Sequence, residues 1–159
     1  MSNNDDIETV WKIVDKVRVA MVVTRRENEL EGRPLHAYPD RDAHRIFFMT
    51  DSEHVIGEVN SDGRVLLSFS DPSGNNFAAI DGEGVVKNDR HKIKDLWTPW
   101  AEAFWKTPDN PAIRIIEVVP HGARYWDAPG KLATTLSMIA GAILGKQPNP
   151  GDSGNVRMT

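Results

Sequence analysis

The fold is set by residues 64–87, RVLLSFSDPSGNNFAAIDGEGVVK. Two segments rich in β-branched and apolar residues, 64–70 and 77–87, flank the polar loop DPSGNN, which is typical of two strands joined by a turn. Gly82 and Gly84 interrupt the second segment, and glycine inside a strand predicts a bulge or a strong bend. Because such bends close sheets into barrels, the stretch favours a small antiparallel barrel.

Four further strands are predicted outside this pair, at residues 19–24, 33–38, 45–50 and 113–120. The first three follow one another through polar turns, so three antiparallel strands in succession are the simplest account. Helices are predicted at residues 5–17, 52–59, 88–97 with a restart at Thr98-Pro99, and about 131–145. Parallel βαβ alternation is absent, so the predicted class is mainly β, a six-stranded antiparallel barrel with flanking helices.

The length of 159 residues suits one domain, which we place at residues 1–145, followed by a Pro/Gly-rich C-terminal tail at 146–159. The net charge of −4 argues against nucleic acid or an anionic membrane as the main partner. The absence of cysteine excludes thiolate and cysteine-based metal sites, and fits a cytoplasmic location. The N-terminus lacks a secretory pattern, and the five histidines lack metal-ligand spacing, so we expect no metal.

One group of polar residues has the chemistry of a phosphate site. If strands 33–38 and 45–50 pair, Arg33 lies near the turn after Thr50, where Ser52 begins a helix and His54 follows. A guanidinium, hydroxyls and helix N-terminal amides together suit a phosphate monoester. A surface arginine beside an ordinary helix cap is the alternative, and the register of antiparallel strands cannot be fixed from sequence.

Tryptophan is unusually frequent, with five residues against two tyrosines. We interpret Trp97, Trp100 and Trp105 as core or subunit-interface residues rather than as ligand-stacking residues. Trp126 is predicted in a loop after the last strand. There it either closes over a planar ligand or covers the core.

Four motifs resemble those of the pyridoxamine 5′-phosphate oxidase-like flavoproteins, and within them the general stress protein 26 group. They are RPL at 33–35, FFMTDSEH at 47–54, DGEGVVKNDRHKIKDLW at 81–97 and RIIEVVPHGARYWD at 114–127. Their order and spacing carry the resemblance over roughly residues 5–130. It implies an FMN-binding split β-barrel that forms a homodimer, with the flavin at the subunit interface.

The resemblance also implies roles for individual residues. Arg33 resembles the phosphate-binding arginine, and Pro34-Leu35 the backbone along the flavin ring. The end of the 45–50 strand would lie beside the ring and ribityl chain, Ser52 would bind the phosphate, and residues of the second subunit would reach the ring. The residues at the strand end are Phe48, Met49 and Thr50. Those from the second subunit are Asn76 or Phe77, together with Trp126.

One departure concerns His54, where the family usually has a lysine. An imidazole is only partly charged near neutral pH, so we expect weaker or pH-dependent phosphate binding, with FAD as an alternative cofactor. The expected function is a flavin-dependent oxidoreductase acting on an unknown small molecule. A non-catalytic flavin-binding or stress-response module, an F420- or haem-related member of the fold, and a ligand-free dimer remain alternatives. True pyridoxamine phosphate oxidation is not expected, because no Arg/His pair is found near the C-terminus, where Arg157 falls in the predicted tail.

Overall fold

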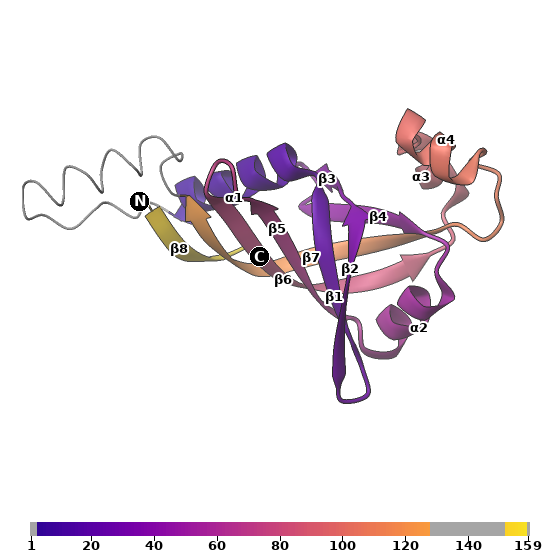
Figure 1. The fold of residues 1–159 in the computed structure, drawn as a ribbon, viewed down its shortest axis with the longest axis horizontal. Coiled ribbons are helices and arrows are strands. Elements are labelled where there is room, and N and C mark those ends of the chain that lie inside the picture. Colours follow the sequence, from indigo (N-terminus) through magenta and orange to yellow (C-terminus); the bar gives the residue numbers. More distant parts are fainter. Residues whose placement is uncertain (1–2, 128–151, 159) are drawn as a thin grey trace, which may run out of the picture.

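A strongly bent antiparallel sheet forms the body of the protein (Figure 1). The computed structural model describes residues 3–127 and 152–158, and the described strands follow the spatial order β2-β1-β5-β6-β7-β4-β3, with β8 paired to β7. The strands are β1 Val19–Arg26, β2 Glu29–His36, β3 Tyr38–Asp40, β4 Arg45–Thr50, β5 Arg64–Asp71, β6 Asn76–Lys87, β7 Arg114–Asp127 and β8 Asp152–Arg157. The helices are α1 Asn3–Val17, α2 Glu53–Asp62, α3 Arg90–Asp95 and α4 Pro99–Trp105. The antiparallel split-barrel class is confirmed, with eight strands within the described ranges instead of the six predicted.

The β5–β6 hairpin has the form that its sequence predicts. Its register runs from Arg64 opposite Glu83 to Asp71 opposite Asn76, and a bulge lies between Asp81 and Gly82. A Cβ on Gly82 would lie 2.6 Å from the carbonyl oxygen of Val119, so only glycine allows β6 and β7 to approach this closely.

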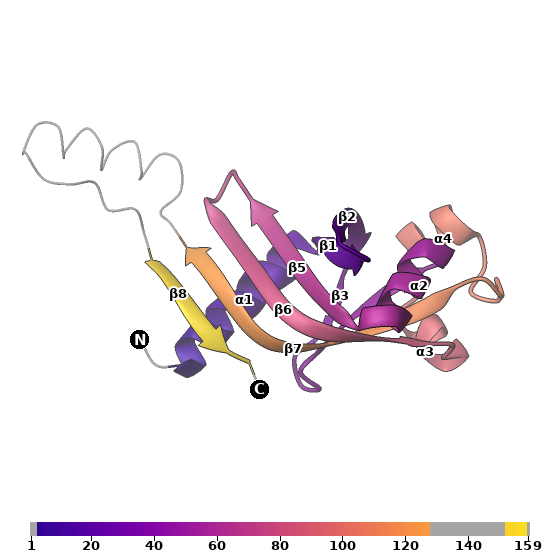
Figure 2. The same cartoon turned by 90° about the horizontal axis from the view of Figure 1, so that it is seen from below.

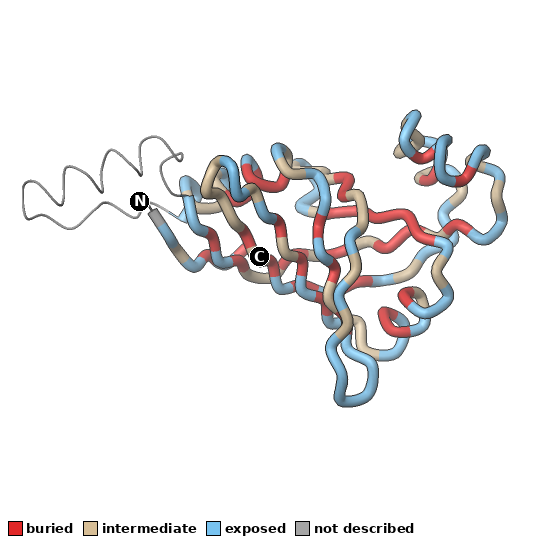
Figure 3. Tube along the Cα trace, viewed as in Figure 1, coloured by how far each residue is buried: buried red, intermediate tan, exposed pale blue. Residues whose placement is uncertain are grey.

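Two hydrophobic clusters stabilise the sheet. In the larger one, α1 packs Val10, Trp11 and Val14 against sheet residues such as Leu67 and Ile80, and Figure 2 shows the helix lying across the sheet. In the smaller one, α3 and α4 cover the opposite side of β4 and the start of β7; its buried members are Tyr38, Phe47, Met49, Ile93, Ala101, Trp105, Ile113 and Ile115. Buried segments concentrate along the strands (Figure 3). The second cluster places α4 beside the end of β4.

The predicted strand at 33–38 is in fact two strands. β2 pairs with β1 and places Arg33 opposite Val22, whereas β3 pairs with β4 and places Tyr38 opposite Phe47. Between them, the N–H of the buried Ala37 donates to the carbonyl of Arg18 at 2.8 Å, outside either ladder. The predicted succession of three paired strands is therefore wrong, since β4 takes β7 as its other neighbour.

The C-terminal prediction also needs correction. Residues 152–157 of the predicted tail form β8 against the second half of β7, so Arg157 lies in a strand opposite Gly122. Trp126 accordingly lies within β7 rather than in a loop. The helix predicted at about 131–145 lies outside the described residues. Among residues 3–127 and 152–158, no helix is long and apolar enough to cross a membrane.

Candidate functional site

An apolar cleft of about 400 Å³ opens where β2, the end of β4 and α4 meet. Predicted site residues from two motifs line it together, namely Pro34, Leu35, Met49, Thr50 and Ser52. Thr50 ends β4, and its Oγ1 accepts a hydrogen bond from the N–H of Ser52 at 3.1 Å. Ser52 then caps α2, with its hydroxyl accepting from the N–H of Val55 at 3.5 Å. The cleft therefore has apolar walls and a polar edge, as small-molecule sites usually do.

Aromatic side chains form the other wall. The Trp100 ring stacks on His36 at a centroid distance of 5.2 Å and on Phe104 at 5.2 Å, with interplanar angles of 25° and 26°. All three residues line the cleft, together with the buried Trp105. Trp100 is 45% exposed and Phe104 68% exposed, so both rings keep a large exposed surface. Trp100 is thus not a core residue, and its assignment to a subunit interface stays a prediction, whereas Trp105 is a core residue that also reaches the cleft.

The sequence contained a signal for this aromatic wall. Thr98 caps α4, its Oγ1 accepting from the N–H of Ala101 at 3.3 Å, and Pro99 occupies the first turn. Trp100 and Phe104 are spaced i, i+4, which places them on one face of the helix, away from the buried Ala101. This i, i+4 spacing of two aromatic residues could have indicated from the sequence that they form one wall of a binding site.

His36 is the titratable group nearest to this wall. Burial, and next the positive charge of Arg18, lower the pKa of His36 below its usual value of 6.5. The imidazole is therefore neutral at pH 7, with one nitrogen able to donate and one able to accept a hydrogen bond.

The Arg33 guanidinium does not line the cleft. Its Nη1 donates to Thr24 Oγ1 at 2.5 Å, and its Nη2 lies 3.0 Å from Glu58 Oε2 and 3.1 Å from Glu31 Oε2. The Thr24 hydroxyl in turn donates to Glu58. Burial alone would raise the pKa of Glu58, but the hydrogen bond from Thr24 and the charge and hydrogen bond of Arg33 bring it below its usual range. Arg33 is therefore already paired with an ionised, buried carboxylate.

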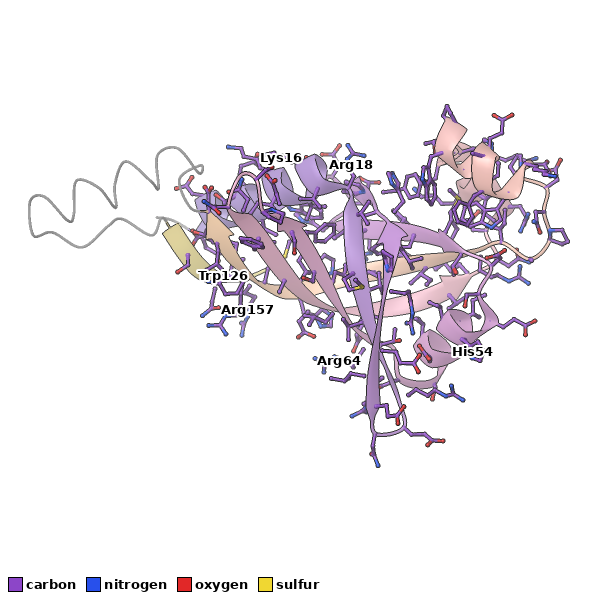
Figure 4. The ribbon with its side chains drawn as sticks, viewed as in Figure 1. Lys16, Arg18, His54, Arg64, Trp126 and Arg157 are labelled. Atoms are coloured by element: carbon purple, nitrogen blue, oxygen red, sulfur yellow. The ribbon has the colours of Figure 1, made fainter. Side chains whose placement is uncertain are left out.

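His54 faces a different depression from Ser52. A hollow of about 300 Å³ is lined by His54 and Glu58 of α2 together with Arg25 and Arg26 of β1. His54 is exposed, and Figure 4 shows it on α2. Arg33, Ser52 and His54 thus do not meet in one pocket, contrary to the predicted phosphate site, because β2 and β4 do not pair.

The remaining predicted site residues lie elsewhere. Phe48 is fully buried in the larger cluster, so its side chain does not face the cleft. Phe77 pairs with Trp126, and Asn76 with Asp127, at the far ends of β6 and β7. Thr50, in the cleft, pairs with Arg114 at the opposite end of β7. Measured along the strand, Arg114 and Trp126 are about 40 Å apart at about 3.3 Å per residue. Figure 4 shows Trp126 near β8, so within one protomer it cannot reach the cleft.

Comparison with known proteins identifies the family of this chain. Residues 5–149 match the family model described as pyridoxamine 5′-phosphate oxidase like. The chain belongs to this family. No curated protein sequence matches it significantly. Within residues 3–127 and 152–158, no group of three or more potential metal ligands is found.

Solved structures share the fold. A candidate general stress protein 26 from Jannaschia sp. CCS1 has a TM-score of 0.81 and 19% identity, covering 97% of this chain and 99% of that chain. The general stress FMN/FAD binding protein of Xanthomonas citri has a TM-score of 0.66 and 24% identity, covering 75% and 86%. An FAD-binding protein of Mesorhizobium loti has a TM-score of 0.59 and 13% identity, covering 79% and 94%.

Proposed function

We propose that the protein binds a flavin, with the ring in the cleft between β2, β4 and α4. The observation that carries this proposal is the convergence of Pro34, Leu35, Met49, Thr50 and Ser52 around one cleft. Its volume of about 400 Å³ lies in the range of roughly 300–1,000 Å³ that is common for small-molecule sites. A flat aromatic ring suits the exposed part of the Trp100 ring, while backbone groups near Ser52 suit the polar atoms of the ring and its side chain.

A homodimer is part of the proposal. The exposed Val19 and Met21 of β1 and Leu66 of β5 lie on one side of the sheet, where Met21 pairs with Pro34 and Val23 with Leu66. Val19 and Pro34 also line the cleft, so this apolar surface continues into it. A second copy seated here would cover both, and the expected contribution of Asn76, Phe77 and Trp126 to the ring would come from that copy.

FMN is the proposed cofactor, with FAD as the alternative, and the proposed class is an oxidoreductase acting on a small molecule. A bound flavin supplies the redox chemistry. The residues of this chain bind and orient it: the aromatic wall and Pro34 contact the ring faces, and the neutral His36 can exchange a hydrogen bond at the edge of the cleft. A second candidate is a flavin-binding module without turnover, which the scarcity of titratable side chains in the cleft favours, since among the described residues only His36 and Asp51 line it.

Titration of the purified protein with FMN tests the proposal. We expect saturable quenching of flavin and tryptophan fluorescence, and no response to adenosine monophosphate, which has a phosphate and a planar base but no flavin ring. Bleaching of the bound flavin by NAD(P)H without air, followed by recovery in air, would support the oxidoreductase, and stable colour would support the binding module. A protein that binds no FMN would refute both.

A further inference from the structure

The Arg33 guanidinium is enclosed by acceptors from its own chain. Its side chain is 19% exposed, and that of Glu58, across an ion pair of 3.0 Å, is 6% exposed. Thr24 connects the two, accepting from Arg33 and donating to Glu58. Hydrogen bonds to a charged partner are stronger than neutral ones, and a buried ion pair that loses one member leaves an uncompensated charge. The pair therefore holds Arg33 in place.

We propose that Glu58 acts as an internal counter-anion that withholds Arg33 from a flavin phosphate, so that the protein selects flavins by their ring. This inference rests on the proposed flavin site. It assigns to Glu58 a specificity-determining role: the protein binds riboflavin, which has no phosphate, about as tightly as FMN.

The position of Glu58 explains why a phosphate does not simply displace it. Glu58 lies in the middle of α2 on its buried face, beside Val55 and Val59, and its Oε2 contacts both the Thr24 hydroxyl and the Arg33 guanidinium, so a phosphate that displaced it would break both contacts. A phosphate that approached Arg33 would also meet a carboxylate on the same guanidinium, and two like charges at one site repel each other.

The surrounding charges do not compensate for Glu58. In the adjoining hollow, Arg25, which is held by Asp62 at 2.8 Å, and Arg26 are balanced by the acidic Glu27 and Glu53, which leaves no excess positive charge there. Among the described residues, Glu58 Oε1 is buried and has no hydrogen-bond partner. A free carboxylate oxygen accepts hydrogen bonds, so it suits a hydroxyl group and opposes a phosphate oxygen.

The isosteric substitution Glu58→Gln tests the role directly. It keeps an acceptor for Thr24 and Arg33 while removing the negative charge. We expect FMN to bind at least about tenfold more tightly to the variant, because Arg33 becomes available for a charge-assisted contact, with riboflavin affinity changed by less than about threefold. Glu31→Gln is the matched control: Glu31 also contacts Arg33, but its side chain is 41% exposed, so the FMN to riboflavin ratio should change little.

A double variant and a thermal-unfolding measurement test the same role of Glu58 independently. The double variant Arg33→Gln/Glu58→Gln, which leaves no buried charge unpaired, should return the FMN to riboflavin ratio to the wild-type value. Thermal unfolding with inorganic phosphate should show a phosphate-dependent rise in Tm for Glu58→Gln and none for the wild type.

The outcomes separate this inference from the proposed function. If flavins bind but Glu58→Gln leaves the FMN to riboflavin ratio unchanged, the role of Glu58 is refuted and the flavin site stands. If neither flavin binds any variant, the proposed function fails, and the phosphate-dependent Tm alone decides whether Glu58 withholds Arg33. A wild type that already prefers FMN by about a hundredfold also overturns the inference.

Discussion

Replacement of Trp100 by alanine should weaken ligand binding while costing less stability than replacement of the buried Trp105. Trp100 stacks on both His36 and Phe104, lines the cleft and remains 45% exposed. Its neighbour on the same helix, Trp105, is 8% exposed and belongs to the smaller hydrophobic cluster. Removal of the Trp105 indole should therefore lower the unfolding free energy more than removal of the Trp100 indole.

The magnitudes follow from burial and stacking. A tryptophan with about half of its surface buried loses roughly 100 Å² of contact, which at about 25 cal/mol per Å² costs about 2.5 kcal/mol of unfolding free energy. Trp105→Ala should cost more, about 3–5 kcal/mol, as for other buried aromatic residues. Stacking of a planar base on an aromatic side chain contributes about 1–3 kcal/mol, so Trp100→Ala should weaken FMN binding by roughly tenfold to a hundredfold.

Fluorescence titration with FMN and urea denaturation measure the two quantities on the same preparation. Trp97→Ala is the matched control, because Trp97 packs at 6.4 Å from Trp105 but does not line the cleft. It should lose stability and keep its FMN affinity. If Trp100→Ala binds FMN as tightly as the wild type, the cleft is not the ring site and the reasoning is refuted.

Three further predictions concern the other parts of the account. His54→Lys should leave FMN affinity about unchanged at both about pH 6 and about pH 8, contrary to the expectation from the sequence, because His54 lines a hollow separate from the cleft; isothermal titration that finds tighter binding by the variant would contradict this separation. Met21→Glu should convert a dimer into a monomer in analytical ultracentrifugation, since it places a charge on the apolar surface, whereas Lys12→Glu on the exposed side of α1 should leave the dimer intact. Because the folded-state pKa of Glu58 lies below its usual 4.5, its ionised form contributes stability above that pH and loses it as the pH falls further. The unfolding free energy of the wild type should therefore decline more steeply than that of Glu58→Gln below about pH 4.5, and parallel curves from urea denaturation would rule this out.

The sequence predicts most of the fold because its strands carry strong local patterns. The alternation in residues 64–87, with Gly82 at the bend, indicated both the hairpin and the bulge that the structure contains. By contrast, β8 has the sequence DSGNVR, with a single apolar residue, Val156, that packs into the core. Its pairing is favoured by Gly154, which allows the Tyr125 ring to pack against its backbone. Such an edge strand is defined by its partner rather than by its own residues.

The site was harder to predict because it depends on long-range pairing. The contact between the RPL and TDSEH motifs was anticipated for the cleft residues, since Pro34 and Leu35 do meet Thr50 and Ser52. The direction of the Arg33 side chain was not anticipated, because its partner Glu58 lies 25 residues further along the chain. Glu58 lies on a helix whose packing no local sequence pattern specifies. The break of the strand at Ala37 also had no signal, since an alanine between His36 and Tyr38 fits a continuous strand equally well.

A crystal structure of the protein grown with FMN would locate the flavin ring. We expect density for the ring in the cleft, in contact with Pro34, Met49 and Trp100, with Arg33 still paired to Glu58. Density for the ring at another surface, or an empty cleft at saturating FMN, would contradict the proposed ring site.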